Sequence, residues 1–145
     1  MVEIGGYPFE NPKLLEQALT TQDYSKQEKD KGNKVPCQMP MRTLGDRVLS
    51  LILAEYYYPL YATQKEINDA MEMIECSKGE CILAEFLKFQ IVNKSNNDKN
   101  LDSEDFLSET TEAIIAAVFL DSDYYTCKDV VLGWLRETKQ IPALE

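Results

Sequence analysis

The sequence predicts an all-α fold, a single domain of about six to seven helices. Apolar residues recur at helical spacing in one segment after another, and no segment shows the alternation of apolar and polar residues that a half-buried strand requires. With 145 residues, 44% of them hydrophobic, the chain is long enough to bury one core without disulfide bonds. No linker or internal repeat divides it, so we expect one domain over residues 1–145.

The first helix is predicted from Pro12 to about Thr20. Asn11 is a favourable N-cap residue, and proline suits the first helical position. The apolar residues that follow share one helical face: Leu14, Leu15, Ala18 and Leu19. The preceding segment, Tyr7-Pro8-Phe9, is expected to be extended and to cover this helix.

Residues 22–39 are expected to form a loop. The segment is polar, with lysines mixed among acidic residues, and prolines stand near its end at Pro36 and Pro40. The lysines could contact phosphate, but the acidic residues among them cancel much of their field. A solvated loop is therefore the favoured prediction.

The central helix is predicted from Thr43 to Tyr58, where Pro59 disfavours helical geometry in the residue before it. From Val48 to Ala54 all residues but one are apolar. A helix that is hydrophobic nearly all round is expected to be covered on every side. Asp46 stands at the start of this helix, and a buried carboxylate is unfavourable unless a cation meets it.

Two shorter helices are expected after the central one. Thr63-Gln64-Lys65-Glu66 forms a capping box for a helix with one apolar face. Ser77-Lys78-Gly79-Glu80 forms a second capping box, for a helix that ends near Gln90. A polar loop over residues 93–102 follows.

A second strongly apolar helix is predicted from about Ser103 to Asp121. Residues 113–120 are all apolar, and Glu109 and Glu112 precede this run. Like the central helix, it would carry carboxylates into the interior at its first turn. A last helix, from about Tyr124 to Lys139, presents its apolar residues inward: Val130, Val131, Trp134 and Leu135.

Composition excludes several classes of function. The chain has no histidine, so it cannot use a Ser-His-Asp or Cys-His nucleophilic site or an imidazole general base. Its net charge of -10 repels nucleic acid and anionic lipid, so RNA binding would need a local patch or metal ions that bridge carboxylates and phosphates. No apolar run approaches the roughly 18 residues of a membrane span, and the N-terminus lacks the features of a signal peptide. We therefore expect a cytoplasmic protein.

The cysteines are predicted to be free. They stand at Cys37, Cys76, Cys81 and Cys127, without the paired C-x-x-C spacing of a zinc site. We expect unreactive thiols in a reducing compartment.

Asp46, Glu109 and Glu112 are the candidate metal ligands. Phosphodiester hydrolysis by a divalent cation requires converging oxygen ligands, and a helix delivers them at intervals of three or four residues, as at Glu109 and Glu112. Asp46 would join them if the starts of the two apolar helices lie together. Alternatively, acids in a first turn only complement the helix dipole, and spacing alone favours that alternative.

The order of residues around these acids resembles the catalytic domain of the ribonuclease III family. Leu44-Gly45-Asp46-Arg47-Val48-Leu49 is similar to the end of the family signature. Glu109-Thr110-Thr111-Glu112, running into an apolar helix that ends in Leu120-Asp121, is similar to a second family motif. The segment from Phe9 to Thr20 resembles the family's first helix, and residues 80–84 stand where the family runs into a similar helix. The resemblance covers nearly the whole chain.

Membership would imply an all-helical fold that dimerises about the signature helix and cuts double-stranded RNA with Mg²⁺ or Mn²⁺, leaving a 3′-hydroxyl and a 5′-phosphate. The resemblance makes Asp46 and Glu112 the catalytic pair. Glu109, where the family usually has aspartate, would be a third metal ligand beside them. The family's usual double-stranded RNA-binding domain has no counterpart in residues 1–145, so substrate recognition would depend on other factors, such as a ribonucleoprotein partner.

Departures from the family signature surround Asp46. Arg42 replaces a glutamate four residues before it, Met39 and Pro40 replace the preceding glutamate and arginine, and Thr43 replaces an aromatic residue that helps to join the family's subunits. Arginine cannot ligate a metal and is always charged. Arg42 would therefore weaken or abolish cation binding, hold a phosphate directly, or pair with Asp46.

Three functions are compatible with this pattern. The first is a diverged, metal-dependent endoribonuclease that acts on double-stranded RNA. The second is the same fold without catalysis, as a scaffold in a ribonucleoprotein or as the partner of an active subunit. The third is a helical protein with no RNA role, whose acids only cap its helices.

Overall fold

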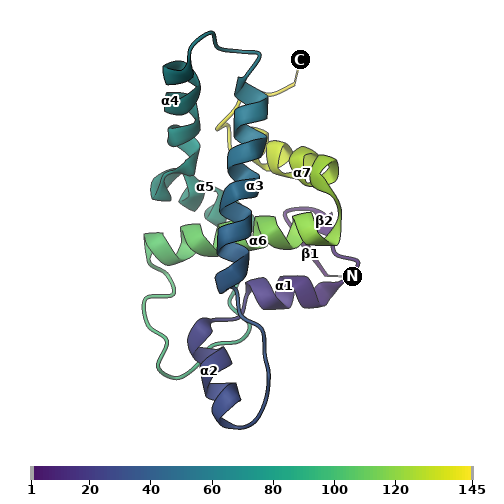
Figure 1. Ribbon diagram of the computed structural model, residues 1–145, viewed down its shortest axis with the longest axis vertical. Coiled ribbons are helices and arrows are strands. Elements are labelled where there is room, and N and C mark those ends of the chain that lie inside the picture. Colours follow the sequence, from purple (N-terminus) through teal and green to yellow (C-terminus); the bar gives the residue numbers. More distant parts are fainter. Residues whose placement is uncertain (1, 145) are drawn as a thin grey trace.

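A computed structural model describes residues 2–144 of the chain (Figure 1). Within that range it has one short antiparallel hairpin and seven helices: β1 Glu3–Ile4, β2 Tyr7–Pro8, α1 Pro12–Ala18, α2 Gln22–Asp30, α3 Met39–Tyr57, α4 Gln64–Glu75, α5 Ser77–Leu87, α6 Glu104–Asp121 and α7 Tyr124–Glu137. The prediction of an all-α fold with six to seven helices is confirmed. The hairpin was expected only as an extended segment, because two-residue strands are too short to show a period.

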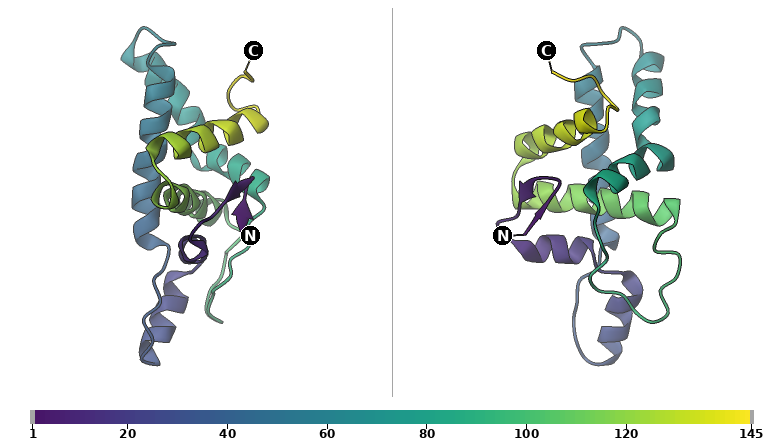
Figure 2. Two further views of the ribbon diagram at one scale, coloured as in Figure 1. Left: turned by 90° about the vertical axis from the view of Figure 1, so that its right-hand side faces the viewer. Right: turned by 180° about the vertical axis from the view of Figure 1, so that it is seen from behind.

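Helices α3 and α6 form the centre of the fold. Figure 1 shows α3 running across α6, and the left view of Figure 2 shows α6 nearly end-on beside α3. Leu49, Ile52 and Leu53 of α3 are fully buried, and so are residues 113–118 of α6. These are the two segments that the sequence marks as apolar nearly all round. Both bury most of their apolar residues, but the expectation that they are covered on every side is wrong at Leu51, which is 55% exposed, and at Leu120, which is 49% exposed.

The other elements cover this crossing. Helices α1 and α7 lie on opposite sides of α6 (Figures 1 and 2), and α5 packs against it as well. Helix α4 runs beside α3, and α2 projects at the opposite end of the molecule from α4. The indole Nε1 of Trp134 donates a hydrogen bond of 2.8 Å to the carbonyl oxygen of Gly5, which ties the hairpin to α7.

The prediction of a loop over residues 22–39 is wrong for its first half. Helix α2 begins after Thr21, whose hydroxyl accepts a hydrogen bond from the amide of Tyr24. The helix has no buried residue, so its sequence shows no apolar period from which it could be predicted. The remainder is an irregular segment, and the Ser25 hydroxyl donates to the carbonyl oxygen of Val35 across it.

The prediction that the acids stand in first helical turns is also wrong. Helix α3 begins at Met39, so Asp46 lies well inside it, and its first turn contains no acidic residue. The first-turn acids of α6 are Glu104 and Asp105, and Glu112 lies beyond them. Complementing a helix dipole therefore does not explain Asp46 or Glu112, because that effect fades beyond the terminal turn.

The two predicted capping boxes have different outcomes. The Thr63 hydroxyl accepts from the Glu66 amide and donates to the Glu66 carboxylate, which confirms the first box. Helix α5 is capped instead by Cys76, whose Sγ accepts from the amide of Gly79. The predicted capping role of Glu80 is therefore wrong.

The four cysteines are free, as predicted. Cys127 is buried, and burial raises the pKa of its thiol to about 12. Among residues 2–144, no helix combines the length and the apolar character that a membrane span requires.

Candidate active site

The candidate site lies where α3 and α6 touch backbone to backbone. A Cβ atom added to Gly45 would stand 1.7 Å from the carbonyl oxygen of Glu112, so no residue with a side chain fits at position 45 without moving a helix. Asp46 follows this glycine directly. The close crossing therefore brings Asp46 beside Glu112, and the expectation that these two acids meet is confirmed.

A third carboxyl group enters the site from α5. A Cβ atom at Gly79 would stand 2.5 Å from the carbonyl oxygens of both Met73 and Ile74, so α5 begins in close contact with the end of α4. Glu80, the next residue, is only 3% exposed. Its carboxyl group is a close neighbour of that of Glu112.

The electrostatics of this cluster favour protonation. Burial raises the pKa of Glu80, and the adjacent carboxyl groups of Glu112 and Asp46 raise it further. Burial also raises the pKa of Glu112, and the neighbouring Asp46 adds to the effect. Like charges brought together out of water share protons because they cannot all ionise.

Glu75 borders the cluster and shows a milder form of the same effect. Burial raises its pKa, and Asp46 and Glu72 add to the rise. A hydrogen bond from the Ser50 hydroxyl acts in the opposite direction. Glu75 thus has a donor of its own, which Glu80 lacks.

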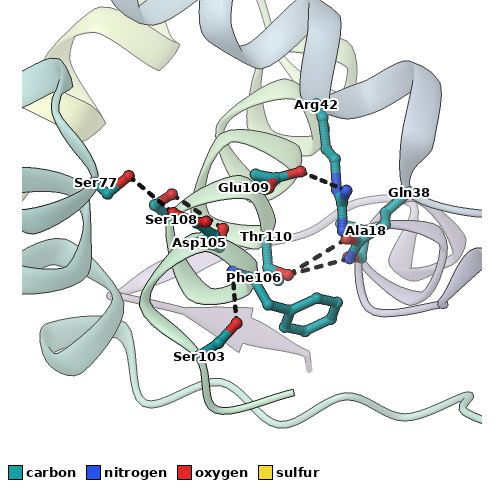
Figure 3. Close-up of polar contacts among 10 residues, drawn as sticks. All are labelled: Ala18, Gln38, Arg42, Ser77, Ser103, Asp105, Phe106, Ser108, Glu109 and Thr110. Atoms are coloured by element: carbon teal, nitrogen blue, oxygen red, sulfur yellow. Dashed lines mark hydrogen bonds and ion pairs between the residues drawn. The ribbon is translucent and has the colours of Figure 1, made fainter. Parts of the chain in front are cut away.

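Arg42 pairs with Glu109, as Figure 3 shows. The guanidinium Nη1 lies 2.5 Å from Oε2 of Glu109, and Nε donates a bond of 2.7 Å to Oε1 of Gln38. The guanidinium carbon also lies 5.6 Å from the centre of the Phe106 ring. The side chain of Arg42 is 18% exposed and that of Glu109 is 43% exposed, so the pair is shielded from solvent only on the arginine side.

The residue that anchors Arg42 is itself buried. Gln38 donates through Nε2 to the carbonyl oxygen of Ala18 at 2.7 Å and to the hydroxyl of Thr110 at 3.3 Å (Figure 3). Arg42 is therefore held by α1, α3 and α6 together. The alternative in which Arg42 pairs with Asp46 is wrong: Asp46 pairs with Arg47, at 2.5 Å and largely in solvent.

The predicted site residues thus separate into two groups. Asp46 and Glu112 come together, whereas Glu109 is turned toward Arg42. Glu80 was not predicted as a site residue. One signal could have identified it: Gly79-Glu80 repeats the pattern of Gly45-Asp46, in which a glycine permits a close backbone contact and the following acid enters the site.

The donor chemistry suits a hard divalent cation, since every group is a carboxylate oxygen. No three acidic, cysteine or histidine side chains within residues 2–144 are already arranged around a common point as metal ligands. However, Oε2 of Glu80 is buried and has no hydrogen-bond partner in the described part of the chain. Within the cluster, Asp46 alone has a cationic partner among residues 2–144, namely Arg47. A group of carboxyl groups that includes an unpartnered buried oxygen fits a cationic ligand in charge and in donor type.

Comparison with known proteins identifies the family of the chain. The family model described as Ribonuclease-III-like matches residues 11–138. The chain is 31% identical over 133 residues to Ribonuclease 3 of Francisella tularensis subsp. novicida, covering 89% of this chain and 54% of that protein. It is 27% identical over 135 residues to Ribonuclease 3 of Shewanella amazonensis, covering 89% of this chain and 56% of that protein.

The fold matches solved structures as well. The nuclease domain of ribonuclease III from Campylobacter jejuni superposes with a TM-score of 0.79 at 22% identity, covering 94% of each chain, and its description concerns flexibility in a region involved in dimer formation. The present chain spans just over half the length of the curated relatives that it matches. Since the family model covers most of its length, the chain belongs to the ribonuclease-III-like family.

Proposed function

We propose that this domain is a metal-dependent endoribonuclease that cleaves double-stranded RNA. The observation that carries the proposal is the backbone contact of Gly45 with Glu112, which sets Asp46 and Glu112 side by side. Both acids stand in motifs that resemble those of the ribonuclease III family, and helix capping explains neither of them.

Asp46 and Glu112 would hold Mg²⁺ or Mn²⁺ through their carboxylate oxygens. When bound, such a cation lowers the pKa of a coordinated water and neutralises charge on the phosphate. Glu109, the third ligand that the family resemblance implies, can contribute only when Arg42 releases it. Arg47 is 76% exposed and pairs with Asp46, so it would have to exchange this partner to contact a phosphate of the RNA.

A lysine-rich hollow offers a surface for RNA on a chain whose net charge is -10. Lys26, Lys29 and Lys34 line a depression of about 650 Å³ between α2 and the segment after it. Lysines gathered on one surface can contact phosphates even where the whole molecule is acidic. This hollow supports the phosphate-contacting alternative for this segment.

We further propose that the protein is a cytoplasmic homodimer. The large apolar side chain of Leu51 is 55% exposed on α3, the helix that carries the signature motif, and that of Tyr58, directly after the helix, is 77% exposed. Exposed apolar side chains on one helix are typical of a surface that binds another protein. The four free thiols suit a reducing compartment.

A non-catalytic scaffold is the second candidate function. The Arg42–Glu109 pair favours it, because it places a cation where the resemblance implies a ligand and it engages one of the three predicted ligands. In that case the domain would bind RNA or an active partner subunit without cutting.

Cleavage of long duplex RNA separates the two candidates. With Mg²⁺ or Mn²⁺ the domain should cut the duplex, and Asp46→Asn and Glu112→Gln should each reduce the rate by about 100-fold or more, since each removes a ligand. Asp69→Asn is the matched control, because it makes the same change in an exposed pair with Lys65. Binding of duplex RNA without cleavage at any concentration of either cation would support the scaffold instead.

A further inference from the structure

We propose that Glu80 on α5 supplies the third carboxylate of the cation site, in place of Glu109. The inference rests on the proposed function to the extent that a divalent cation binds beside Asp46 and Glu112. It assigns to this chain a ligand set in which Asp46, Glu80 and Glu112 come from three different helices.

The state of the Glu80 carboxyl group is the first observation. The residue is 3% exposed, its carboxyl group meets that of Glu112, and Oε2 has no hydrogen-bond partner among residues 2–144. None of the ion pairs formed within those residues includes Glu80. Buried carboxyl oxygens in proteins are nearly always satisfied by a donor or a cation.

The engagement of Glu109 is the second observation. Its carboxylate is bound by Arg42, which is held in turn by Gln38 and by the ring of Phe106 (Figure 3). Releasing Glu109 would break this ion pair and leave the partly buried guanidinium of Arg42 without its carboxylate partner. Glu80 can act as a ligand without breaking an ion pair.

The backbone supports the same assignment. Gly79 permits the close contact of α5 with the carbonyl oxygens of Met73 and Ile74, and Gln140 donates a hydrogen bond of 2.9 Å to the carbonyl oxygen of Gly79. The first turn of α5 is therefore held in place before any ligand binds. A carboxylate on a rigid element is well suited to hold a cation.

Titration of the intact chain with Mn²⁺, followed by calorimetry, tests this assignment without measuring activity. Glu80→Gln is expected to weaken Mn²⁺ binding by at least about tenfold, whereas Glu109→Gln should change the affinity by less than about twofold. Glu85→Gln is the matched control, because Glu85 lies on the same helix but is exposed. Unchanged Mn²⁺ affinity in Glu80→Gln, an equal loss in Glu109→Gln, or no Mn²⁺ binding by the unaltered chain would each overturn the proposal.

The Arg42→Gln background gives a second test that leaves Glu80 intact. With Arg42 removed, Glu109 is released, and Glu109→Gln should now weaken Mn²⁺ binding, which it does not do when Arg42 is present. An effect of Glu109→Gln of the same size in both backgrounds would contradict the proposal. Circular dichroism of each variant confirms that it is folded.

The outcome also separates this proposal from the proposed function. If Mn²⁺ binding requires Glu80 but duplex RNA is not cut, the ligand assignment stands and the nuclease activity fails. If duplex RNA is cut and Glu80→Gln binds Mn²⁺ like the unaltered chain, the activity stands and the ligand assignment fails.

Discussion

Two carboxyl groups, one at the end of α6 and one on α5 next to α6, differ in their hydrogen-bond partners. Asp121, at the end of the helix, accepts hydrogen bonds from the Tyr7 hydroxyl at 2.6 Å and from the amides of Glu10 and Asn11 at 3.0 and 2.8 Å. Glu80, which meets Glu112 of the same helix, has a buried oxygen with no donor in the described residues. The fold places hydrogen-bond donors around Asp121, whereas it places other carboxyl groups around Glu80.

The electrostatic consequences are opposite as well. Burial acts to raise the pKa of Asp121, but its hydrogen bonds from Tyr7, Asn11 and Glu10 outweigh burial and hold that pKa below its usual value. Burial together with the bond to Asp121 raises the pKa of Tyr7 to about 12, so its hydroxyl remains a donor. Burial and neighbouring acids raise the pKa of Glu80 instead. The comparison indicates that Asp121 serves the fold and that Glu80 serves a ligand.

The largest expected effect comes from disrupting the close contact of α3 with α6 at Gly45. This contact positions Glu112, the neighbour of Glu80. Gly45→Ala places a Cβ atom against the backbone of Glu112 and should reduce the free energy of unfolding by about 3 kcal/mol or more. Gly133→Ala in α7 is the control, because its Cβ atom would meet nothing within 4 Å. That control should be neutral or more stable by about 0.5–1 kcal/mol. Urea unfolding measures both, and equal effects would contradict the close crossing.

Removing the charge of Asp121 should have the next largest effect. Asp121→Asn weakens three hydrogen bonds that tie the hairpin and the start of α1 to α6, and it should lower the free energy of unfolding by about 2 kcal/mol at pH 7.

The effect of Asp121→Asn should also depend on pH. Because the pKa of Asp121 is depressed in the folded protein, its stabilisation is complete above the unfolded pKa of about 3.9 and is lost as pH falls through the lower folded value. The difference between the unaltered chain and Asp121→Asn in urea unfolding should therefore shrink below about pH 4. A difference that does not change with pH would show that the charge of Asp121 is not what stabilises the fold.

The same chemical change at Glu80 should have the smallest effect on stability. In the absence of divalent cations, Glu80→Gln removes no ion pair formed within residues 2–144 and relieves the crowding of acids around Glu112, so the free energy of unfolding should change by less than about 1 kcal/mol or increase. Thermal unfolding in a chelator measures it beside Asp121→Asn. A loss as large as that of Asp121→Asn would mean that Glu80 is a structural acid.

The fold could be predicted from the sequence wherever a helix buries a regular apolar face. The apolar segments of α3 and α6 predict the two central helices, and most of their apolar residues are buried, although Leu51 and Leu120 are exposed. Helix α2 was missed because it buries no residue and therefore has no apolar period. The predicted start of α3 is too late because the prolines before Thr43 favour a loop, whereas Pro40 is compatible with the first turn of a helix that begins at Met39.

The candidate site was predictable only in part, for a related reason. The resemblance to the ribonuclease III family implies Asp46 and Glu112 as a pair, whereas spacing alone favours the helix-dipole alternative; the helix crossing brings the two acids together. The pairing of Arg42 with Glu109 could not be read from the sequence, since it depends on the position of Gln38 between α1 and α6. The sequence Ser77-Lys78-Gly79-Glu80 predicts a capping role for Glu80, because it has the spacing of a capping box. The same sequence is compatible with a buried acid that follows a glycine.

The sequence alone determined that this chain is helical, that two of its helices are buried, and that acids enter the interior with them. Periodicity and composition are local properties, and they are sufficient for those statements. Only the tertiary structure decided which acid meets which neighbour, because a side chain's partner depends on where helices cross and which face each one turns inward. In the folded chain Asp121 accepts hydrogen bonds, Glu109 pairs with Arg42, and the neighbours of Glu80 are other carboxyl groups.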